Sequence, residues 1–291
     1  MKPVVVADVA PLRQVVADAR RRGRTIGLVP TMGALHRGHT SLFDLARAET
    51  GFVVASIFVN PTQFGPHEDF RRYPRPLEQD VEQCGKAGVD LVFVPEPAVM
   101  YPSGFRTFVE VTGLQDVLEG ASRPGHFRGV ATVVLKLFNL VQPDHAYFGQ
   151  KDAQQVRIIQ QMVRDLHLPV DVRVCPTVRE ADGLAISSRN RYLAPAERQN
   201  ATCLFQALEA ARLRIKKGER SAEAVRQAML NRIAAVQGAT LDYAEAVDFE
   251  NLRPLDPLRG RILLAIAVRF GSIRLIDNIL LDITQDQVAT Q

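Results

Sequence analysis

The segment VPTMGALHRGHTSL, Val29 to Leu42, places two histidines between an apolar strand pattern and an apolar helical pattern. The strand pattern covers Thr25–Val29, and the helical spacing runs from about Thr40 to Ala48. Between them, His36 and His39 follow a run of small residues. A strand that leads directly into a helix is the repeating unit of α/β proteins with a parallel sheet, so this segment predicts that fold class.

The same alternation continues through the first two-thirds of the chain. A polar loop with several prolines, Asn60–Arg75, interrupts it. The alternation predicts a Rossmann-like, doubly wound parallel sheet with helices on both faces. The expected strands are Thr25–Val29, Phe52–Val59, Val89–Val94, His145–Phe148 and Val170–Val174. The expected helices are one that contains Leu12 and Ala19 and ends at Gly23, then Thr40–Ala48, Leu77–Ala87, Gly129–Leu140 and Asp152–Leu166.

The pattern changes after Asn190. Two helices are expected, at Pro195–Lys216 and Ala222–Val236, and most of the remaining chain is strand-like. This favours a smaller C-terminal α+β domain, with domains at residues 1–180 and 181–291. The expected strands of the second domain are Leu241–Val247, Arg261–Arg269 and Ser272–Asp277.

The composition excludes several classes of protein. The chain has 291 residues, 46% of them hydrophobic and 23% charged, which is typical of a globular protein of about two domains. The net charge of +4 comes from scattered Lys and Arg, and there is no Trp, so a nucleic-acid-binding surface is not expected. No segment is long and apolar enough to act as a signal peptide or to span a bilayer, and no membrane partner is expected.

The cysteines agree with a cytoplasmic location. Cys84, Cys175 and Cys203 are widely spaced, odd in number and without a Cys-x-x-Cys pair. A disulfide framework or structural zinc site is therefore not expected, as in proteins of a reducing cytoplasm.

The histidine segment has the features of an anion site. In doubly wound sheets, ligands bind beyond the carboxyl ends of the strands, which is where the expected strand delivers His36 and His39. A helix that starts there would also offer free backbone N–H groups. Gly33 and Gly38 would allow a ligand to approach the backbone closely. The alternative is that one histidine caps the helix and the other is a surface residue, but two histidines and two glycines at one junction favour function.

Three other segments carry polar side chains near expected strand ends or at the domain junction. Asn60 and Gln63 could bind a ligand with hydroxyl or carboxylate groups, although an Asn-Pro turn alone explains Asn60. Lys151 could reach a phosphate, and Asp152 could cap a helix or help to hold a metal ion. Gln155 lies one turn later on the same side as Lys151. An ordinary capped helix is the alternative for that segment. The last segment, AISSRNRYL, offers two hydroxyls and Arg189, and alone it is a weak signal.

Together these motifs resemble the pantothenate synthetase family, whose members are pantoate–β-alanine ligases. The family is part of the HIGH-motif nucleotidyltransferase superfamily, and His36-Arg37-Gly38-His39 is this chain's version of that motif. The segments that carry the resemblance lie between Val29 and Asn278; they are VPTMGALHRGH, SIFVNPTQF, LEGASRPGHFRGVATVVLKLFNLVQPD, YFGQKDAQQ, ADGLAISSRN and RLIDN.

The resemblance implies a two-step reaction. The carboxylate of (R)-pantoate attacks the α-phosphorus of ATP, which gives pantoyl adenylate and pyrophosphate. The amine of β-alanine then attacks the acyl carbon, and AMP leaves with formation of pantothenate. Mg²⁺ or Mn²⁺ is expected to bridge the ATP phosphates, the C-terminal domain to close over ATP, and the protein to be a homodimer.

The resemblance also implies residue roles. His36, His39, Lys151 and Arg189 are the expected catalytic residues, with His39 as the proton donor. Gln63, Gln155 and Asn60 are expected to bind pantoate or β-alanine, and Asp152 is the expected metal contact. The expected ATP-binding residues are Met32, Gly33, Ala34, Leu35, His36, Arg37, Gly38, His39, Gly149, Gln150, Lys151, Asp152, Val178, Ile186, Ser187, Ser188 and Arg189.

Two positions depart from the family pattern. Gln150 stands where Glu is expected, and the loss of that charge puts a metal or backbone role at this position in question, whereas Lys151 and Asp152 beside it are intact. Ile186 stands where some relatives carry Met, and its effect on adenine contact should be mild.

The main rival function is an adenylyltransferase that transfers AMP to a phosphorylated acceptor and stops, but it explains the Asn60 and Gln63 segment less well. A nucleic-acid-binding module is suggested only by the pI of about 9.1.

Overall fold

The computed structural model describes residues 2–66, 68–284 and 288–290, which belong to two units. Unit 1 consists of Met1–Gly149 and Gln154–Cys175, and unit 2 consists of Gln150–Ala153 and Pro176–Gln291. The expected division into residues 1–180 and 181–291, with closure of the second domain over ATP, stays a prediction. No helix in the described ranges has both the length and the apolar character needed to cross a bilayer.

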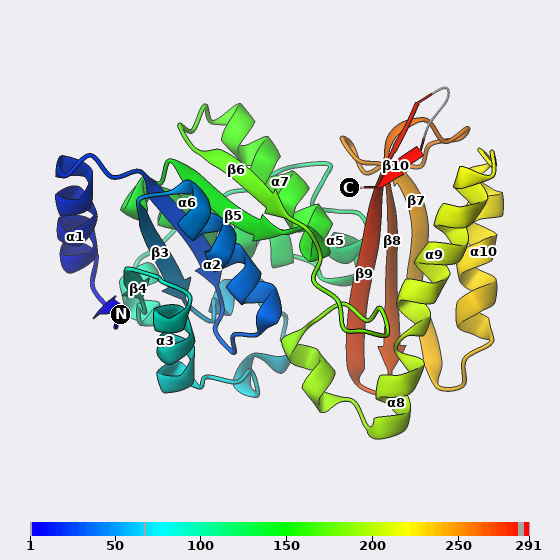
Figure 1. The fold of residues 1–291 in the computed structure, drawn as a ribbon, viewed down its shortest axis with the longest axis horizontal. Coiled ribbons are helices and arrows are strands. Elements are labelled where there is room, and N and C mark those ends of the chain that lie inside the picture. Colours follow the sequence, from blue (N-terminus) through cyan, green and yellow to red (C-terminus); the bar gives the residue numbers. More distant parts are fainter. Residues whose placement is uncertain (1, 67, 285–287, 291) are drawn as a thin grey trace. The chain divides into compact units, whose positions relative to one another are not determined.

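Unit 1 is built on a six-stranded sheet in which every pair of neighbouring strands is parallel (Figure 1). The strand order is β1-β4-β3-β2-β5-β6, and this confirms the predicted parallel α/β fold. The strands are β1 (Val4–Val6), β2 (Ile26–Thr31), β3 (Phe52–Ile57), β4 (Leu91–Phe93), β5 (His145–Gly149) and β6 (Asp171–Cys175).

Helices cover the sheet of unit 1 because its central strands are apolar on both faces. All six residues of β3 are buried. Helices α2 and α3 contact each other and share one core with alternate strand residues such as Val29 and Tyr147, whereas α1 packs against α6 and both contact β2. The helices are α1 (Val9–Arg21), α2 (Arg37–Glu49), α3 (Leu77–Lys86), α4 (Pro97–Met100), α5 (Glu119–Ser122), α6 (His126–Val141) and α7 (Ala153–Asp165).

The strand order reverses between β2 and β5. From β2 the chain moves outward through β3 and β4, whereas β5 starts the other half of the sheet and is followed by β6. The strands β2 and β5 pair directly and end at Thr31 and Gly149. In doubly wound folds this switch point is where ligands bind. The loop that carries the two histidines starts there.

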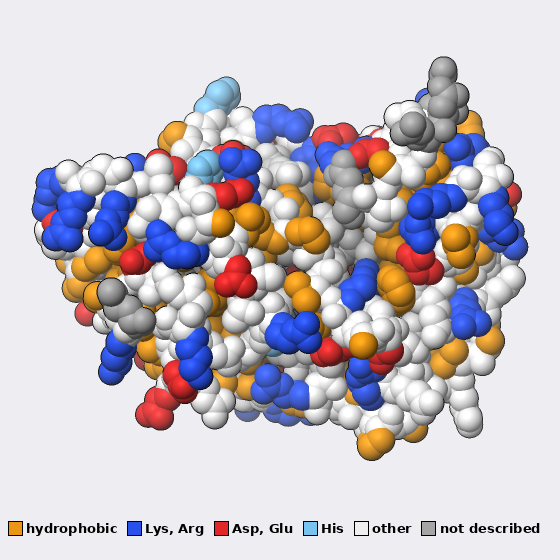
Figure 2. All heavy atoms as spheres, in the orientation of Figure 1, with side chains coloured by type: hydrophobic (Ala, Val, Ile, Leu, Met, Phe, Trp, Pro, Cys, Tyr) orange, Lys and Arg blue, Asp and Glu red, His pale blue; other side chains and the backbone are white. Residues whose placement is uncertain are grey.

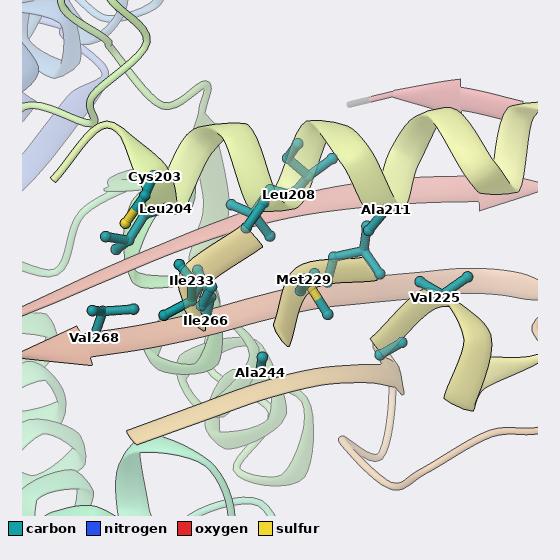
Figure 3. Close-up of a cluster of buried hydrophobic side chains, with 14 of the residues drawn as sticks. Cys203, Leu204, Leu208, Ala211, Val225, Met229, Ile233, Ala244, Ile266 and Val268 are labelled. Carbon is teal, nitrogen blue, oxygen red and sulfur yellow. The ribbon is translucent and has the colours of Figure 1, made fainter. Parts of the chain in front are cut away.

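Unit 2 contains an antiparallel sheet with two long helices. The strand order is β10-β9-β8-β7. Buried side chains of α9 and α10, including Leu208 and Met229, pack against sheet residues such as Ile266 (Figure 3). This confirms the predicted α+β architecture. The elements are α8 (Pro195–Asn200), α9 (Cys203–Lys216), α10 (Ala222–Ala234), β7 (Ala239–Asp248), β8 (Gly260–Phe270), β9 (Ile273–Ile283) and β10 (Val288–Thr290).

Some expected elements differ in the structure. The single helix expected at Pro195–Lys216 is two helices, α8 and α9. The N–H of Leu204 bonds to the carbonyl of Ala201, three residues back, so the regular ladder is interrupted where the apolar spacing continues. The edge strands β1 and β10 were not predicted, since three-residue segments are too short to show a period. The expected loop Asn60–Arg75 contains two short 3₁₀ turns.

Candidate active site

The loop after β2 is held by hydrogen bonds from its own backbone. The N–H of Gly33 donates to Thr31 Oγ1 at 3.2 Å. The N–H groups of Ala34 and Leu35 donate to Oδ2 and Oδ1 of Asp80, each at 2.8 Å. The N–H groups of Gly33, Ala34 and Leu35 are therefore engaged within the protein and do not serve as donors to a ligand.

The two histidines lie against each other at the start of α2. His36 is the N-cap, and His39 is the third residue of the helix. Their ring centroids are 4.0 Å apart, and the N–H of His36 donates to Nδ1 of His39 at 3.3 Å. An Nδ1 that accepts a hydrogen bond has no proton, so a neutral His39 ring carries its proton on Nε2. His39 therefore has a hydrogen-bond donor on the far side of its ring.

The predicted residues Asn60 and Gln63 form one buried amide network. Asn60 is 1% exposed, and its Nδ2 donates to Gln63 Oε1 at 3.0 Å and to the carbonyl of Gly129 at 3.1 Å. Its Oδ1 accepts from the hydroxyl of Tyr101 at 2.8 Å. Because both amide protons of Asn60 are used inside the protein, these contacts favour a role in orienting Gln63 over direct contact with a substrate.

Gln63 presents its amide nitrogen to a weak partner. Its Nε2 lies 3.0 Å from the thioether sulfur of Met32, at the end of the strand that leads to the histidines. A thioether is a weak acceptor, so a ligand hydroxyl or carboxylate would compete for this donor. The pair links two sequence segments that were predicted separately.

The backbone of Gln63 is fixed by α6. At Gly129 a side chain would collide with the backbone of Thr62 and Gln63, so only glycine allows α6 to approach this closely. His126 Nδ1 contacts the carbonyl of Gln63 at 2.8 Å, and its Nε2 lies 3.1 Å from a guanidinium nitrogen of Arg123. Arginine only donates, so Nδ1 of His126 holds the proton and donates to Gln63.

Burial is the main reason that His126 is neutral. Burial, and then the neighbouring Arg123, lower the pKa of His126 to about 4. Arg123 donates two hydrogen bonds to the carboxylate of Glu68, both at 2.7 Å. Burial opposes ionisation of Glu68, but these bonds outweigh it and hold the pKa of Glu68 below its ordinary value.

The segment after β5 contributes to both units. Gly149 ends β5 in unit 1, and Gln155 is a half-buried residue of α7 in the same unit. The neighbouring Gln154 is buried, and its Nε2 donates to the carbonyls of Leu114 and Val117 at 2.8 Å. Gln154 therefore has a structural role, and contact of the adjacent Gln155 with pantoate stays a prediction.

Lys151 and Asp152 belong to unit 2 and interact weakly with each other. The Nζ of Lys151 is 3.5 Å from Oδ1 of Asp152. Nδ2 of Asn278, on β9, donates to the carbonyl of Lys151 at 2.8 Å and to that of Gln150 at 3.0 Å. The side chain of Gln150 donates to Asn278 Oδ1 at 3.1 Å. Gln150 and Asn278 thus form a buried pair that fixes the backbone on which Lys151 is placed.

A buried ion pair supports Asn278. Asp277 is 3% exposed and receives two hydrogen bonds from Arg179, at 2.5 and 3.0 Å. Arg179 also donates to the carbonyl of Asn278 at 3.3 Å. The Cζ atom of its guanidinium lies over the ring of Phe205, 4.5 Å from the ring centroid. Burial raises the pKa of Asp277, although Arg179 opposes that shift.

The remaining predicted residues share a hairpin of unit 2. The N–H of Ile186 donates to the carbonyl of Val178 at 3.0 Å, so these two predicted ATP-binding residues are paired. Ser187 caps the short turn that follows, Ser188–Tyr192, and its Oγ accepts from the N–H of Arg189 at 3.3 Å. The side chains of Ser188 and Arg189 are partly exposed, as phosphate ligands would need to be.

Cysteine chemistry is not part of this site. Burial raises the pKa of Cys84 to about 12, with a smaller contribution from the charge of Asp80, and burial raises the pKa values of Cys175 and Cys203 to about 11. These thiols stay protonated near neutral pH and are poor nucleophiles. Within the described ranges, no three His, Cys, Asp or Glu side chains gather as a metal site.

The face drawn in Figure 2 shows Lys and Arg side chains spread among acidic and apolar ones, as their scatter in the sequence indicates.

The structure adds residues that sequence reasoning did not single out: Asp80, Tyr101, His126 and Asn278. Asp80 lies in an ordinary amphipathic helix, and only its contact with a distant loop reveals it. His126 and Asn278 stand inside motifs that carry the family resemblance, which was the available signal.

Comparison with known proteins gives consistent matches. The family model of pantoate-beta-alanine ligase matches residues 4–280. The chain is 57% identical over 279 residues to the pantothenate synthetase of Moorella thermoacetica, covering 96% of this chain and 99% of that protein.

Solved structures agree with that match. The crystal structure of pantothenate synthetase from Thermus thermophilus has a TM-score of 0.90 and 50% identity, over 94% of this chain and 98% of that one. The pantoate-beta-alanine ligase of Francisella tularensis, complexed with beta-gamma ATP and beta-alanine, has a TM-score of 0.78 and 35% identity, over 96% and 97%.

Proposed function

Since the chain belongs to the pantoate-beta-alanine ligase family, we propose that it condenses (R)-pantoate with β-alanine in an ATP-dependent, AMP-forming reaction that makes pantothenate. The observation that carries this proposal is the histidine pair at the start of α2, beyond the carboxyl end of β2 at the switch point of the sheet. The relative from Francisella tularensis was solved with beta-gamma ATP and with β-alanine, the second substrate of the proposed reaction.

The first step forms a bond between a carboxylate oxygen of pantoate and the α-phosphorus of ATP. The bond from that phosphorus to the bridging oxygen breaks, and pyrophosphate leaves. An anion attacks a polyanion here, so the protein must supply donors and positive charge to the phosphates. We assign this task to His36 and His39, with Nε2 of His39 as the donor. Lys151, Ser187, Ser188 and Arg189 would hold the outer phosphates.

The second step forms the amide bond. The neutral amine of β-alanine attacks the acyl carbon of pantoyl adenylate, the acyl–phosphate bond breaks, and AMP leaves with its electron pair. The amine must lose a proton, and the acceptor is a base or water.

Gln63 is assigned to pantoate because its Nε2 has only the thioether of Met32 as its described partner. Gln155 is assigned to pantoate as well, and Asn60 acts by orienting Gln63.

The adenosine part of ATP is assigned to two segments. We propose that the loop Met32–His39 and the residues Gly149–Asp152 contact the nucleotide. Val178 and Ile186 are proposed to contact adenine from the hairpin, where a backbone hydrogen bond holds them side by side.

We include Mg²⁺, or Mn²⁺, as the ion that accompanies ATP. The residues present fit an ion held mainly by phosphate oxygens and water, because Asp152 is a single, half-exposed carboxylate and Mg²⁺ commonly takes one or two protein carboxylates. When bound, the ion would neutralise charge on the phosphates. A homodimer and a cytoplasmic location are further proposals; they rest on the family resemblance and on the sequence composition.

Isotope transfer tests the proposed chemistry. Pantoate labelled with ¹⁸O in its carboxylate is incubated with ATP, Mg²⁺ and β-alanine, and the products are analysed by mass spectrometry. The proposed route moves one labelled oxygen into AMP, because the bond that breaks in the second step joins the acyl carbon to that oxygen. Unlabelled AMP, or ADP as the nucleotide product, would exclude an acyl-adenylate route.

A further inference from the structure

Asp80 lies on α3, 46 residues after Ala34 in sequence, yet it contacts the histidine loop directly. Its side chain is 1% exposed. Each carboxylate oxygen accepts one backbone N–H of the loop, from Ala34 and Leu35, at 2.8 Å. A buried carboxylate is costly unless its oxygens are satisfied, and these two amides provide that satisfaction. The contact therefore ties α3 to the segment that immediately precedes His36.

The loop needs this tie because its backbone is strained. Ala34 has a φ of +51°, in the left-handed region that residues other than glycine rarely adopt. Gly33 also has a positive φ, +80°, and a Cβ there would lie 2.8 Å from Oδ2 of Asp80 and 3.0 Å from a methyl carbon of Ile57. The carboxylate thus packs against a glycine and holds the next residue in an unfavourable conformation. Such strain persists only where the surroundings enforce it.

The conformation of this loop decides where the two histidines lie. His36 follows Leu35 and is the N-cap of α2, and its N–H bonds to Nδ1 of His39. A rotation about the backbone of Ala34 or Leu35 would move His36 and change the bond that sets the tautomer of His39. Reacting groups tolerate little displacement, and an error of about 1 Å can slow catalysis by about 10²-fold.

We infer that Asp80 is a positioning residue for the adenylation step, which sets the His36–His39 pair through the backbone of Ala34 and Leu35. This inference rests on the proposed ligase function. Asp80 touches no substrate in this account. Its carboxylate occupies the loop amides that a phosphate would otherwise use, so phosphate recognition falls to the imidazoles and to the first turn of α2.

The test compares Asp80→Asn with Asp90→Asn, which changes a similar carboxylate at the amino end of a strand. Asp90 precedes β4, and its Oδ2 accepts the N–H of Val53 and a guanidinium N–H of Arg47, both at 2.8 Å. Asp80→Asn keeps one acceptor oxygen but sets an NH₂ group against a backbone N–H. Asp90→Asn loses a similar contact away from the histidines. Both variants should melt at lower temperature than the wild type.

Pantoate-dependent exchange between ATP and pyrophosphate, measured at saturating substrates, separates the two carboxylates. Asp80→Asn should slow exchange by about 10- to 100-fold, while Asp90→Asn should retain the wild-type rate. Amide hydrogen exchange should show lost protection at Ala34 or Leu35 only in Asp80→Asn. An Asp80→Asn enzyme that exchanges as fast as Asp90→Asn would overturn the inference, whereas a wild type without exchange would instead contradict the proposed function.

A rescue variant and a double mutant identify the route of the effect. Glycine adopts a left-handed conformation without strain, so Ala34→Gly should restore part of the exchange rate that Asp80→Asn loses. In a His39→Ala background, Asp80→Asn should add little further loss, because both act through one group. Additive losses and no rescue would mean that Asp80 acts only through stability. Should Asp80→Asn not fold, Gly33→Ala disturbs the same contact from the loop and should also slow exchange; a normal rate would contradict the inference.

Discussion

The backbone N–H of His36 donates to Nδ1 of His39 at 3.3 Å, so the second histidine of the motif helps to hold the first. This relationship gives His39 two separable tasks. Nδ1 accepts a backbone N–H at the start of α2, and Nε2 is the proposed donor to phosphate. An asparagine could perform the first task, because its side-chain oxygen can accept the same N–H, but it cannot place a donor where Nε2 lies.

Substitution of His39 should therefore separate folding from chemistry. His39→Ala and His39→Asn should both lower the rate of adenylate formation by about 10²–10³-fold, the usual cost of one transition-state donor. His39→Asn should be the more stable of the two in thermal melts. The exposed His167, which has a φ of +52°, provides the control variant His167→Asn with normal activity. Near-normal turnover of His39→Asn would show that His39 only caps the helix.

Gln63 should govern the affinity for pantoate. The proposed contact with pantoate is expected in both the ground state and the transition state, so Gln63→Ala should raise the KM for pantoate strongly. Asn60→Ala should do the same indirectly, because it releases the side chain of Gln63 and leaves the carbonyl of Gly129 without this donor. Steady-state kinetics with each substrate varied in turn would measure this. A raised KM for ATP with an unchanged KM for pantoate would mean that Gln63 is assigned to the wrong substrate.

Lys151→Met should damage the first half-reaction selectively. Methionine keeps much of the apolar stem but removes the charge, so folding should be retained while adenylation drops by about two or more orders of magnitude. Pantoyl adenylate supplied from outside should still react with β-alanine at close to the wild-type rate, since it has no β- or γ-phosphate. Single-turnover assays of each half would measure this, with the exposed Lys217→Met as control. Equal damage to both halves would give Lys151 a general structural role.

Asn278 should matter through the backbone of Lys151. Asn278→Ala removes the donor to the carbonyls of Gln150 and Lys151, so the KM for ATP should rise and adenylation should slow. The control is Asn200→Ala, which removes an exposed amide that donates to the carbonyl of Gln237 at 3.0 Å. If both variants kept wild-type ATP kinetics, the contact between β9 and Lys151 would have no catalytic consequence.

The pH dependence of stability should report on His126. Its pKa in the folded protein is lowered to about 4, below the ordinary value of 6.5. The unfolded chain therefore binds more protons in this window, and the free energy of unfolding should fall as the pH drops from 6.5 towards 4. Charging of His126 is opposed by burial and then by Arg123, and is favoured by the carbonyl of Gln63 and by Glu68 and Glu119.

The comparison is made with His126→Gln in chemical denaturation at several pH values. The pKa of Glu68 is lowered in the folded protein from its ordinary value of 4.5. Titration of Glu68 therefore changes the free energy of unfolding mainly below pH 4.5. Between pH 6.5 and 4.5 the stability of His126→Gln should therefore vary less than that of the wild type. Equal slopes for the two proteins in this range would contradict the assignment of His126 as a buried neutral group.

Sequence reasoning predicted the sheet and the placement of the main site segments because these features have local signals. The apolar run of β3 is buried on both faces, and the strand before His36 ends where a doubly wound sheet binds its ligands. The joint order of the motifs then indicated the family. These signals do not require knowledge of which strands pair.

The remaining features depend on contacts between distant segments. Nothing near Asp80 in sequence distinguishes it from other acids of a helix, and its partners Ala34 and Leu35 lie 46 and 45 residues away. The contact of Asn278 with Lys151 spans 127 residues. The short strands β1 and β10 are defined by their pairing with β4 and β9, which are distant in sequence or outside the three-residue pattern itself.

Isotope exchange between ATP and pyrophosphate tests the central claim most directly. Purified wild-type protein is incubated with ATP, labelled pyrophosphate and Mg²⁺, with pantoate and β-alanine each present or absent. The acyl-adenylate account predicts incorporation of label into ATP that requires pantoate and Mg²⁺ but not β-alanine. Absence of exchange in the presence of pantoate, or exchange that begins only when β-alanine is added, would contradict it.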